Sequence, residues 1–185
     1  MANLEGNSET ALTLTQLHDE VLGTLQGAGI DDAELSARRI VEETTGIDIG
    51  QFPVEEDQLV THRAVVRTDA LTTRRANGEP LQYVIGSWNF RYLDLAVDPR
   101  ALIPRPETEA VVGCAVDLLN SSDKNSAESP VVLDLGTGTG AIALSVALEV
   151  PNVRVHATDI SEEALSLTRS NLAGLGRAAA RVQLH

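Results

Sequence analysis

The sequence lacks the features of several protein classes. A single cysteine, Cys114, excludes an internal disulfide and a cluster of thiol ligands, and the four histidines show no metal-ligand spacing. No apolar run approaches the roughly 20 residues that cross a bilayer, and the first residues have neither the basic start nor the apolar segment of a secretory signal. We therefore expect a cytoplasmic protein with no metal and no membrane partner.

Positive charge is also scarce. The 185 residues carry 14 lysines and arginines against 27 acidic residues, a formal net charge of −13. Such a surface repels a phosphate backbone, and the closest basic pairs are only Arg38-Arg39 and Arg74-Arg75. Direct binding to nucleic acid is not expected.

The remaining composition is that of a globular chain, with 43% hydrophobic and 22% charged residues. Its length suits one domain or two small ones, and the patterns divide it into residues 1–76, 77–106 and 107–185.

The first part, residues 1–76, is predicted to be a small helical bundle that docks a partner. Helical spacing of leucine and valine, with capping and stop residues, predicts three helices: about 14–25 ending at Gly27 and Gly29, a second capped by Asp31 or Asp32 and ending at Gly46, and a third from after Pro53 to about Arg75. Acidic residues 55–57 would favour the N-terminus of the third.

The second part, residues 77–106, is predicted to be a linker. β-Forming residues at 83–85 and 90–97 predict a hairpin. Two prolines around Arg105 then make a stiff, extended elbow, after which a helix opens at Glu107. On the helix after this elbow, Cys114 is expected to be a small buried hydrophobic residue.

The third part, residues 107–185, alternates strands and helices after its first helix. An apolar run at 131–135 predicts a buried strand, 141–149 a helix, 153–157 a second strand, and Ser161 caps another helix. A third strand can begin at Val182. This order implies an α/β fold with a parallel sheet and right-handed crossovers.

A glycine-rich loop joins the first strand to its helix. Gly136, Gly138 and Gly140 let backbone approach a ligand closely, at a helix N-terminus. Asp159 ends the next strand, where a carboxylate can accept hydrogen bonds from both hydroxyls of a ribose.

Two ligand classes fit this loop. The glycines and Ala141 satisfy the dinucleotide pattern, whereas Asp134 with the three glycines reads as the pattern of S-adenosylmethionine-dependent methyltransferases. A carboxylate ahead of the loop opposes a pyrophosphate and favours a cationic sulfonium. Dinucleotide binding and a plain strand–helix turn stay open as alternatives.

Four motifs in order give a family resemblance. They are residues 78–86 (Gly-Glu-Pro-Leu-Gln-Tyr-Val-Ile-Gly), 102–109 (Leu-Ile-Pro-Arg-Pro-Glu-Thr-Glu), 134–144 (Asp-Leu-Gly-Thr-Gly-Thr-Gly-Ala-Ile-Ala-Leu), and 159–161 (Asp-Ile-Ser) followed by Ala164-Leu165. The sequence resembles the release factor glutamine methyltransferases (the HemK/PrmC family), which are class I S-adenosylmethionine-dependent methyltransferases.

The resemblance implies a helical bundle, a β-hairpin linker and the first part of a Rossmann-like methyltransferase domain. It implies methyl transfer from S-adenosylmethionine to the side-chain amide nitrogen (N5) of the glutamine in the Gly-Gly-Gln motif of peptide-chain release factors. The cofactor-binding residues it implies are Asp134, Gly136, Thr137, Gly138, Thr139, Gly140, Asp159, Arg105, Glu107 and Thr108. An elbow that clamps two domains explains Arg105 and Glu107 equally well.

One family motif is missing. The resemblance implies an Asn-Pro-Pro-Tyr motif that accepts hydrogen bonds from the substrate amide, and no Pro-Pro pair occurs in the 185 residues. We therefore expect a C-terminally truncated chain that is inactive alone, with no catalytic residue of its own. A non-catalytic binding module that docks a partner through its helical bundle, and a fragment of a nicotinamide-dinucleotide oxidoreductase, are the alternative readings.

Overall fold

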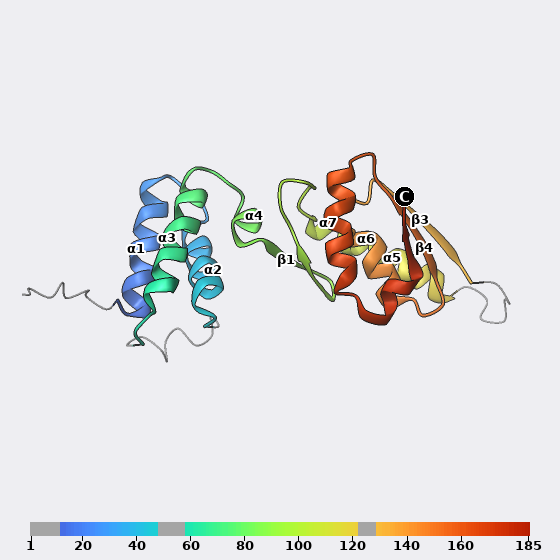
Figure 1. Ribbon diagram of the computed structural model, residues 1–185, viewed down its shortest axis with the longest axis horizontal. Coiled ribbons are helices and arrows are strands. Elements are labelled where there is room, and N and C mark those ends of the chain that lie inside the picture. Colours follow the sequence, from blue (N-terminus) through green and yellow to red (C-terminus); the bar gives the residue numbers. More distant parts are fainter. Residues whose placement is uncertain (1–11, 48–57, 122–128) are drawn as a thin grey trace, which may run out of the picture. The chain divides into compact units, whose positions relative to one another are not determined.

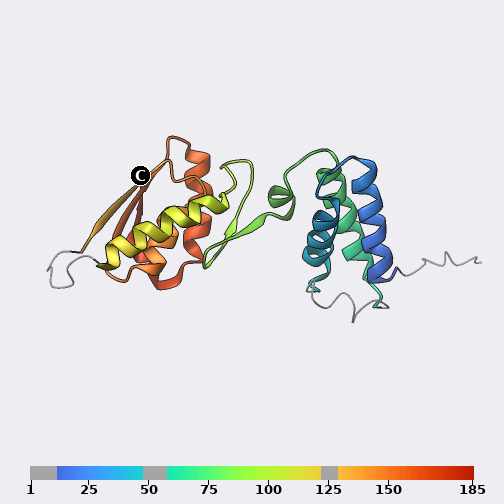
Figure 2. The same ribbon diagram turned by 180° about the vertical axis from the view of Figure 1, so that it is seen from behind.

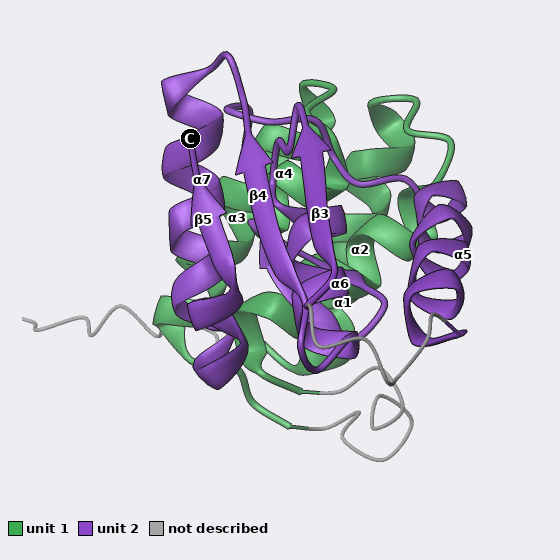
Figure 3. Ribbon diagram, turned by 90° about the vertical axis from the view of Figure 1, so that its right-hand side faces the viewer, with its two compact units in different colours: residues 1–85 green, residues 86–185 purple. Residues whose placement is uncertain are grey.

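The computed structural model describes residues 12–47, 58–121 and 129–185. The chain forms two compact units, residues 1–85 and 86–185, which we call the helical unit and the sheet unit (Figure 3). The expected α/β class is confirmed, with helices in the first unit and a parallel sheet in the second. Of the helices described, none has the length and apolar character needed to cross a membrane.

Three helices pack pairwise in the helical unit: α1 (Leu14–Gly27), α2 (Ala33–Thr45) and α3 (His62–Ala76) (Figure 1). A capping box at Thr13 and Gln16 begins α1. Asp32 precedes α2 as predicted, but its side chain makes no cap and instead pairs with Arg75 at 2.5 Å. Gly46 ends α2 in the left-handed conformation, as its position predicts.

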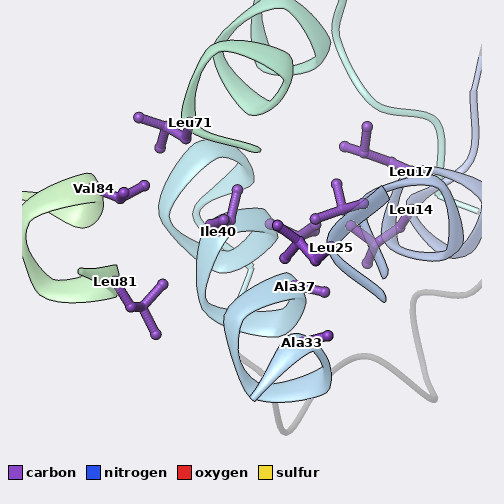
Figure 4. Packing of buried hydrophobic residues seen from close by; sticks show 11 residues of the cluster. Leu14, Leu17, Leu25, Ala33, Ala37, Ile40, Leu71, Leu81 and Val84 are labelled. Carbon is purple, nitrogen blue, oxygen red and sulfur yellow. The ribbon is translucent and has the colours of Figure 1, made fainter. Parts of the chain in front are cut away.

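The core of the helical unit is formed by apolar side chains on the inner faces of the helices. Figure 4 shows the cluster, in which Leu14, Leu25, Ala37 and Ile40 have no exposed surface. Burying a leucine or isoleucine side chain contributes roughly 1.5–3 kcal/mol. Packing of these faces therefore stabilises helices that would be marginal alone.

The third helix begins later than predicted. Its first residue is His62, and Thr61 is the N-cap, whose hydroxyl accepts a hydrogen bond from the Ala64 amide at 3.2 Å. The predicted start after Pro53, with acidic residues 55–57, lies outside the described residues. The Thr61 hydroxyl thus satisfies one of the backbone donors that the first helical turn leaves unpaired, and this favours a start at His62.

The prediction of a strand at residues 83–85 is wrong. These residues end a short helix, α4 (Leu81–Ile85), which follows Pro80. Pro80 accepts the Val84 amide at 3.0 Å, and the Arg74 guanidinium donates to the carbonyls of Tyr83 and Val84 at 2.9 and 3.2 Å. These bonds outweigh the β-preference of the three side chains, because β-propensity depends on context.

The predicted hairpin exists at shifted positions. Its strands are β1 (Ser87–Phe90) and β2 (Leu93–Ala96), paired antiparallel, so residues 90–97 do not form one strand. Arg91 turns the chain with a left-handed φ of 52°. The hairpin belongs to the sheet unit. Its two strands lie side by side (Figure 2).

The rest of the sheet unit follows the predicted alternation. Its elements are α5 (Pro106–Ser121), β3 (Val131–Leu135), α6 (Ala141–Glu149), β4 (Arg154–Thr158), α7 (Glu162–Ala173), the 3-10 helix η2 (Gly176–Arg181) and β5 (Val182–Leu184). The strands lie in the order β3-β4-β5 and are parallel. The predicted sheet and its third strand are confirmed.

The two faces of this sheet differ. Alternate residues such as Val155 and Ala157 point toward α6 and are fully buried. The other face carries Val131, Leu133 and Leu135, whose exposed fractions are 55, 58 and 73%. Among the described elements no helix lies over this open face (Figure 3).

Cys114 on α5 is exposed, so the expectation that it is buried is wrong. The apolar stripe that α5 buries runs through Val112 and Val116 instead. Cys114 lies two residues away from each of them, on a different side of the helix.

Candidate functional site

The glycine loop, residues 136–140, joins β3 to α6. Gly136, Gly138 and Gly140 have φ values of 76, 58 and 85°, a region that costs other residues energy. At Gly140 space is also lacking, because an added Cβ would lie 2.9 Å from both Leu144 and Thr168. The loop conformation therefore depends on glycine, as the sequence predicts.

Most backbone donors of the loop are used within the protein. The amides of Gly136 and Thr137 both donate to the Thr158 carbonyl at 2.9 Å, and the Gly140 amide donates to Thr137 at 2.8 Å. The Gly138 amide donates to Asp159 at 2.9 Å. A loop that binds pyrophosphate offers its amides to the phosphates, so few donors remain here for that purpose.

Asp134 lies under the loop rather than at its surface. It is 8% exposed, and its Oδ2 accepts hydrogen bonds from the Thr137 hydroxyl at 2.8 Å and the Ala143 amide at 3.2 Å. A carboxylate that accepts a donor of the first helical turn caps that helix and complements its dipole. Asp134 therefore fixes the start of α6 and the curvature of the loop.

Asp159 lies beside the loop, at the carboxyl end of β4. Its Oδ2 accepts the Gly138 amide at 2.9 Å and its Oδ1 accepts the Ser161 amide at 3.0 Å. A carboxylate has about four lone-pair positions, so each oxygen keeps one for a ligand hydroxyl. The structure thus brings together the loop, Asp134 and Asp159, all of which the sequence singled out.

The elbow residues are placed differently. Arg105 and Glu107 are exposed and Thr108 is half-buried. Within the described chain, no hydrogen bond or ion pair joins these three side chains to the glycine loop. Closer to the loop lies Ala101, three residues before Pro104, whose side chain is 3.8 Å from where a Cβ of Gly138 would be.

Two polar residues of α7 that the sequence analysis did not single out also hold the loop. The Thr168 hydroxyl donates to the Gly138 carbonyl at 2.7 Å, and the Asn171 amide donates to the Thr139 carbonyl at 2.8 Å. Both lie on the side of α7 that carries buried Leu167. A threonine and an asparagine one turn apart on a packed helix face are the only signal that could have indicated them.

The chemistry of the site favours a cationic nucleoside over a dinucleotide. Two carboxylates, Asp134 and Asp159, bond directly to the loop segment, and most loop amides are already used. Negative charge attracts a sulfonium and an ammonium group and repels a pyrophosphate. The residues present therefore fit S-adenosylmethionine.

Two family descriptions match the sequence. Residues 16–86 match "PrmC N-terminal domain" and residues 113–184 match "Methyltransferase small domain". The two matches correspond to the helical unit and to most of the sheet unit.

Curated relatives named "Release factor glutamine methyltransferase" are similar over most of this chain. The protein from Bifidobacterium longum is 39% identical over 164 residues, which are 87% of this chain and 55% of that protein. The one from Streptomyces coelicolor is 40% identical over 150 residues, 81% of this chain and 51% of that protein. The chain spans about half the length of the curated relatives it matches.

Solved structures give only distant likenesses. The N-terminal domain of human METTL16 in complex with SAH is 12% identical with a TM-score of 0.41, covering 87% of this chain and 54% of that one. A putative transferase, PH0793 from Pyrococcus horikoshii, is 13% identical with a TM-score of 0.42, covering 54% and 34%.

The order of helical unit, hairpin, glycine loop and acidic strand end agrees with these sequence matches. The expectation drawn from the four motifs is confirmed: the chain belongs to the release factor glutamine methyltransferase (HemK/PrmC) family of S-adenosylmethionine-dependent methyltransferases.

Proposed function

We propose that this chain binds S-adenosylmethionine at the glycine loop. We also propose that a protein of the full length of the relatives, containing this chain, methylates the N5 of the glutamine in the Gly-Gly-Gln motif of release factors. The observation that carries the first part is the double anchoring of Asp159 by the amides of Gly138 and Ser161. The names of the relatives support the second part.

Each site residue has a physical role in this proposal. Asp159 holds the ribose hydroxyls with the lone pairs that the backbone leaves free. Residues 136–140 approach the methionine end closely, and Asp134 maintains their curvature while adding negative charge near the ammonium group. When bound, the cofactor supplies an electrophilic methyl group. Arg105, Glu107 and Thr108, at the elbow, line or brace the cofactor side of the site.

The groups that orient the substrate amide, which accepts the methyl group, are assigned to the whole protein and not to this chain alone. An amide nitrogen is a weak nucleophile, because its lone pair is delocalised into the carbonyl, and hydrogen-bond acceptors must orient it. The Asn-Pro-Pro-Tyr motif implied for that task does not occur in these residues. This chain alone is therefore proposed to bind cofactor without transferring the methyl group.

Calorimetry on the chain tests cofactor binding. S-adenosylhomocysteine should give saturable heat and NAD should not. Asp159→Ala should weaken S-adenosylhomocysteine binding by roughly 10-fold or more, the loss expected for a charged hydrogen bond of about 1.5–3 kcal/mol. Glu162→Gln is the matched control, because that side chain is 86% exposed. Uptake of NAD without S-adenosylhomocysteine would overturn the proposal.

A methyl-transfer assay tests the substrate. The whole protein should move a labelled methyl group to a release factor, and a Gly-Gly-Gln to Gly-Gly-Ala substrate should accept none. The chain alone should transfer no methyl group to the release factor. Methylation by the chain alone would contradict the assignment of the acceptor side, and binding of the release factor without methylation by the whole protein would support a docking module instead.

A further inference from the structure

Asn171 joins two segments that are far apart in the sequence. Its Nδ2 donates to the Thr139 carbonyl in the glycine loop at 2.8 Å and to the Ala96 carbonyl on β2 at 3.1 Å. Its Oδ1 accepts the Ala96 amide at 2.8 Å. Both amide hydrogens and the acceptor are therefore used, and the side chain pairs with Ala96 as a neighbouring strand would.

Thr168, one turn earlier on α7, holds the same loop. It is fully buried, and its hydroxyl donates to the Gly138 carbonyl at 2.7 Å. Together Thr168 and Asn171 bind two successive loop carbonyls from one helix face. The Gly138 and Thr139 carbonyls therefore point toward α7. Their orientation determines which face of the loop is turned toward a ligand.

The segment after β2 packs on the same helix. Ala101 forms a buried cluster with Ala164 and Leu167 of α7, and lies against Gly138. Asn171 therefore lies where α7, the glycine loop and the hairpin that leads into the elbow meet. A shift of this side chain would change the separation between the glycine loop and the hairpin.

We propose that Asn171 is a positioning residue for the cofactor: it sets the register between the glycine loop and the hairpin, so that a cofactor bound by the loop faces the elbow. This inference rests on the proposed function of the loop. Asn171 itself does not touch the cofactor in this proposal, and acts through Thr139 and Ala96.

The test uses Asn171→Asp, which preserves shape but replaces two donors with an acceptor facing two carbonyls. It should weaken S-adenosylhomocysteine binding by roughly tenfold or more, since it leaves polar groups unpaired. Ser170→Ala is the matched control, because Ser170 is exposed and its hydroxyl donates to the Ser166 carbonyl within α7. Thr168→Val should weaken binding similarly, and Thr168→Ser should restore it.

A second measurement on the unaltered chain keeps the inference testable if Asn171→Asp does not fold. Coupling between two sites is reciprocal, so S-adenosylhomocysteine should slow amide hydrogen exchange at Ala96 by roughly tenfold. A ligand that binds the folded chain slows every amide that exchanges through unfolding. The positioning role therefore requires the slowing at Ala96 to exceed that at the Val155 amide in β4. Equal slowing at the two amides overturns it.

The outcomes separate the two proposals. If the unaltered chain does not bind S-adenosylhomocysteine, the proposed function fails. If it binds, but exchange at Ala96 is unchanged or a folded Asn171→Asp variant binds equally well, the positioning role is overturned while the proposed function stands.

Discussion

Both backbone conformation and lack of space disfavour any side chain at Gly140. Its φ is 85°, and an added Cβ would lie 2.9 Å from Leu144 and Thr168, which are fully buried, so any shift of theirs disturbs the surrounding packing. Conformational strain and overpacking are separate costs, of about 1–2 kcal/mol and about 1–3 kcal/mol. Both act at this residue, between the first helical turn of α6 and the loop.

Gly140→Ala should therefore lower the free energy of unfolding by about 2–5 kcal/mol. Urea denaturation followed by circular dichroism measures this. Gly176→Ala is the matched control, because Gly176 has a φ of 60° with nothing within 4 Å of its Cβ position, and should lose only the strain. Equal losses in the two variants would show that space at Gly140 is not limiting.

Among the elements, the turn of the hairpin is joined to α5 and α6 by Arg91. Arg91 donates to both carboxylate oxygens of Glu149 on α6, at 2.7 and 2.5 Å, and to the Glu109 carbonyl on α5 at 3.0 Å. It does so from a left-handed turn position, which these bonds stabilise. The side chains of Arg91 and Glu149 are only 18 and 12% exposed.

Glu149→Gln should lower the free energy of unfolding by about 1.5–3 kcal/mol, because it removes charge from a largely buried bidentate pair. Glu34→Gln provides the comparison, since the Glu34–Arg38 pair is about half exposed on both sides and should change stability by less than about 0.5 kcal/mol. Thermal and urea unfolding of both variants measure the difference. A loss at Glu149 no greater than that at Glu34 contradicts the role given to this pair.

The α3–α4 connection should respond to pH. Arg74 donates to both oxygens of Glu79, and this hydrogen bonding lowers the pKa of the Glu79 carboxyl below its ordinary value. A lowered folded-state pKa gives stability that is present above the unfolded pKa and lost as the pH falls through the folded one.

Unaltered chain and Glu79→Gln should therefore differ in unfolding free energy at pH 7, by at most about 1 kcal/mol for this partly exposed pair, and converge toward pH 3. Urea titrations at several pH values follow the difference. A gap that stays constant from pH 7 to pH 3 would exclude a contribution from the ionised pair.

Local patterns predicted most elements, and long-range contacts explain the exceptions. The strand at residues 131–135, the glycine turn and the helix at 141–149 are signalled by adjacent residues, so they were predictable. Residues 83–85 are β-formers, but the Arg74 bonds that make them helical come from nine residues or more upstream. Asn171 bonds Ala96 across 75 residues, which no local pattern indicates.

For the whole molecule, the division into two units predicts independent folding. The helical unit has its own buried core, which includes Leu14, Leu17 and Leu25. Residues 1–85 prepared alone should show a helical circular dichroism spectrum and a cooperative thermal transition. Leu25→Ala should cost about 2–5 kcal/mol in this piece. A random-coil spectrum of residues 1–85 would show that its stability depends on the sheet unit.

The open sheet face has a consequence for handling the protein. A row of three exposed aliphatic side chains on an edge strand offers both apolar area and unpaired backbone groups to a neighbouring molecule. Encounters between such faces increase with the square of concentration. Purified samples should therefore stay monodisperse when dilute and aggregate on concentrating. Leu133→Thr should raise the protein concentration up to which light scattering shows a monodisperse sample.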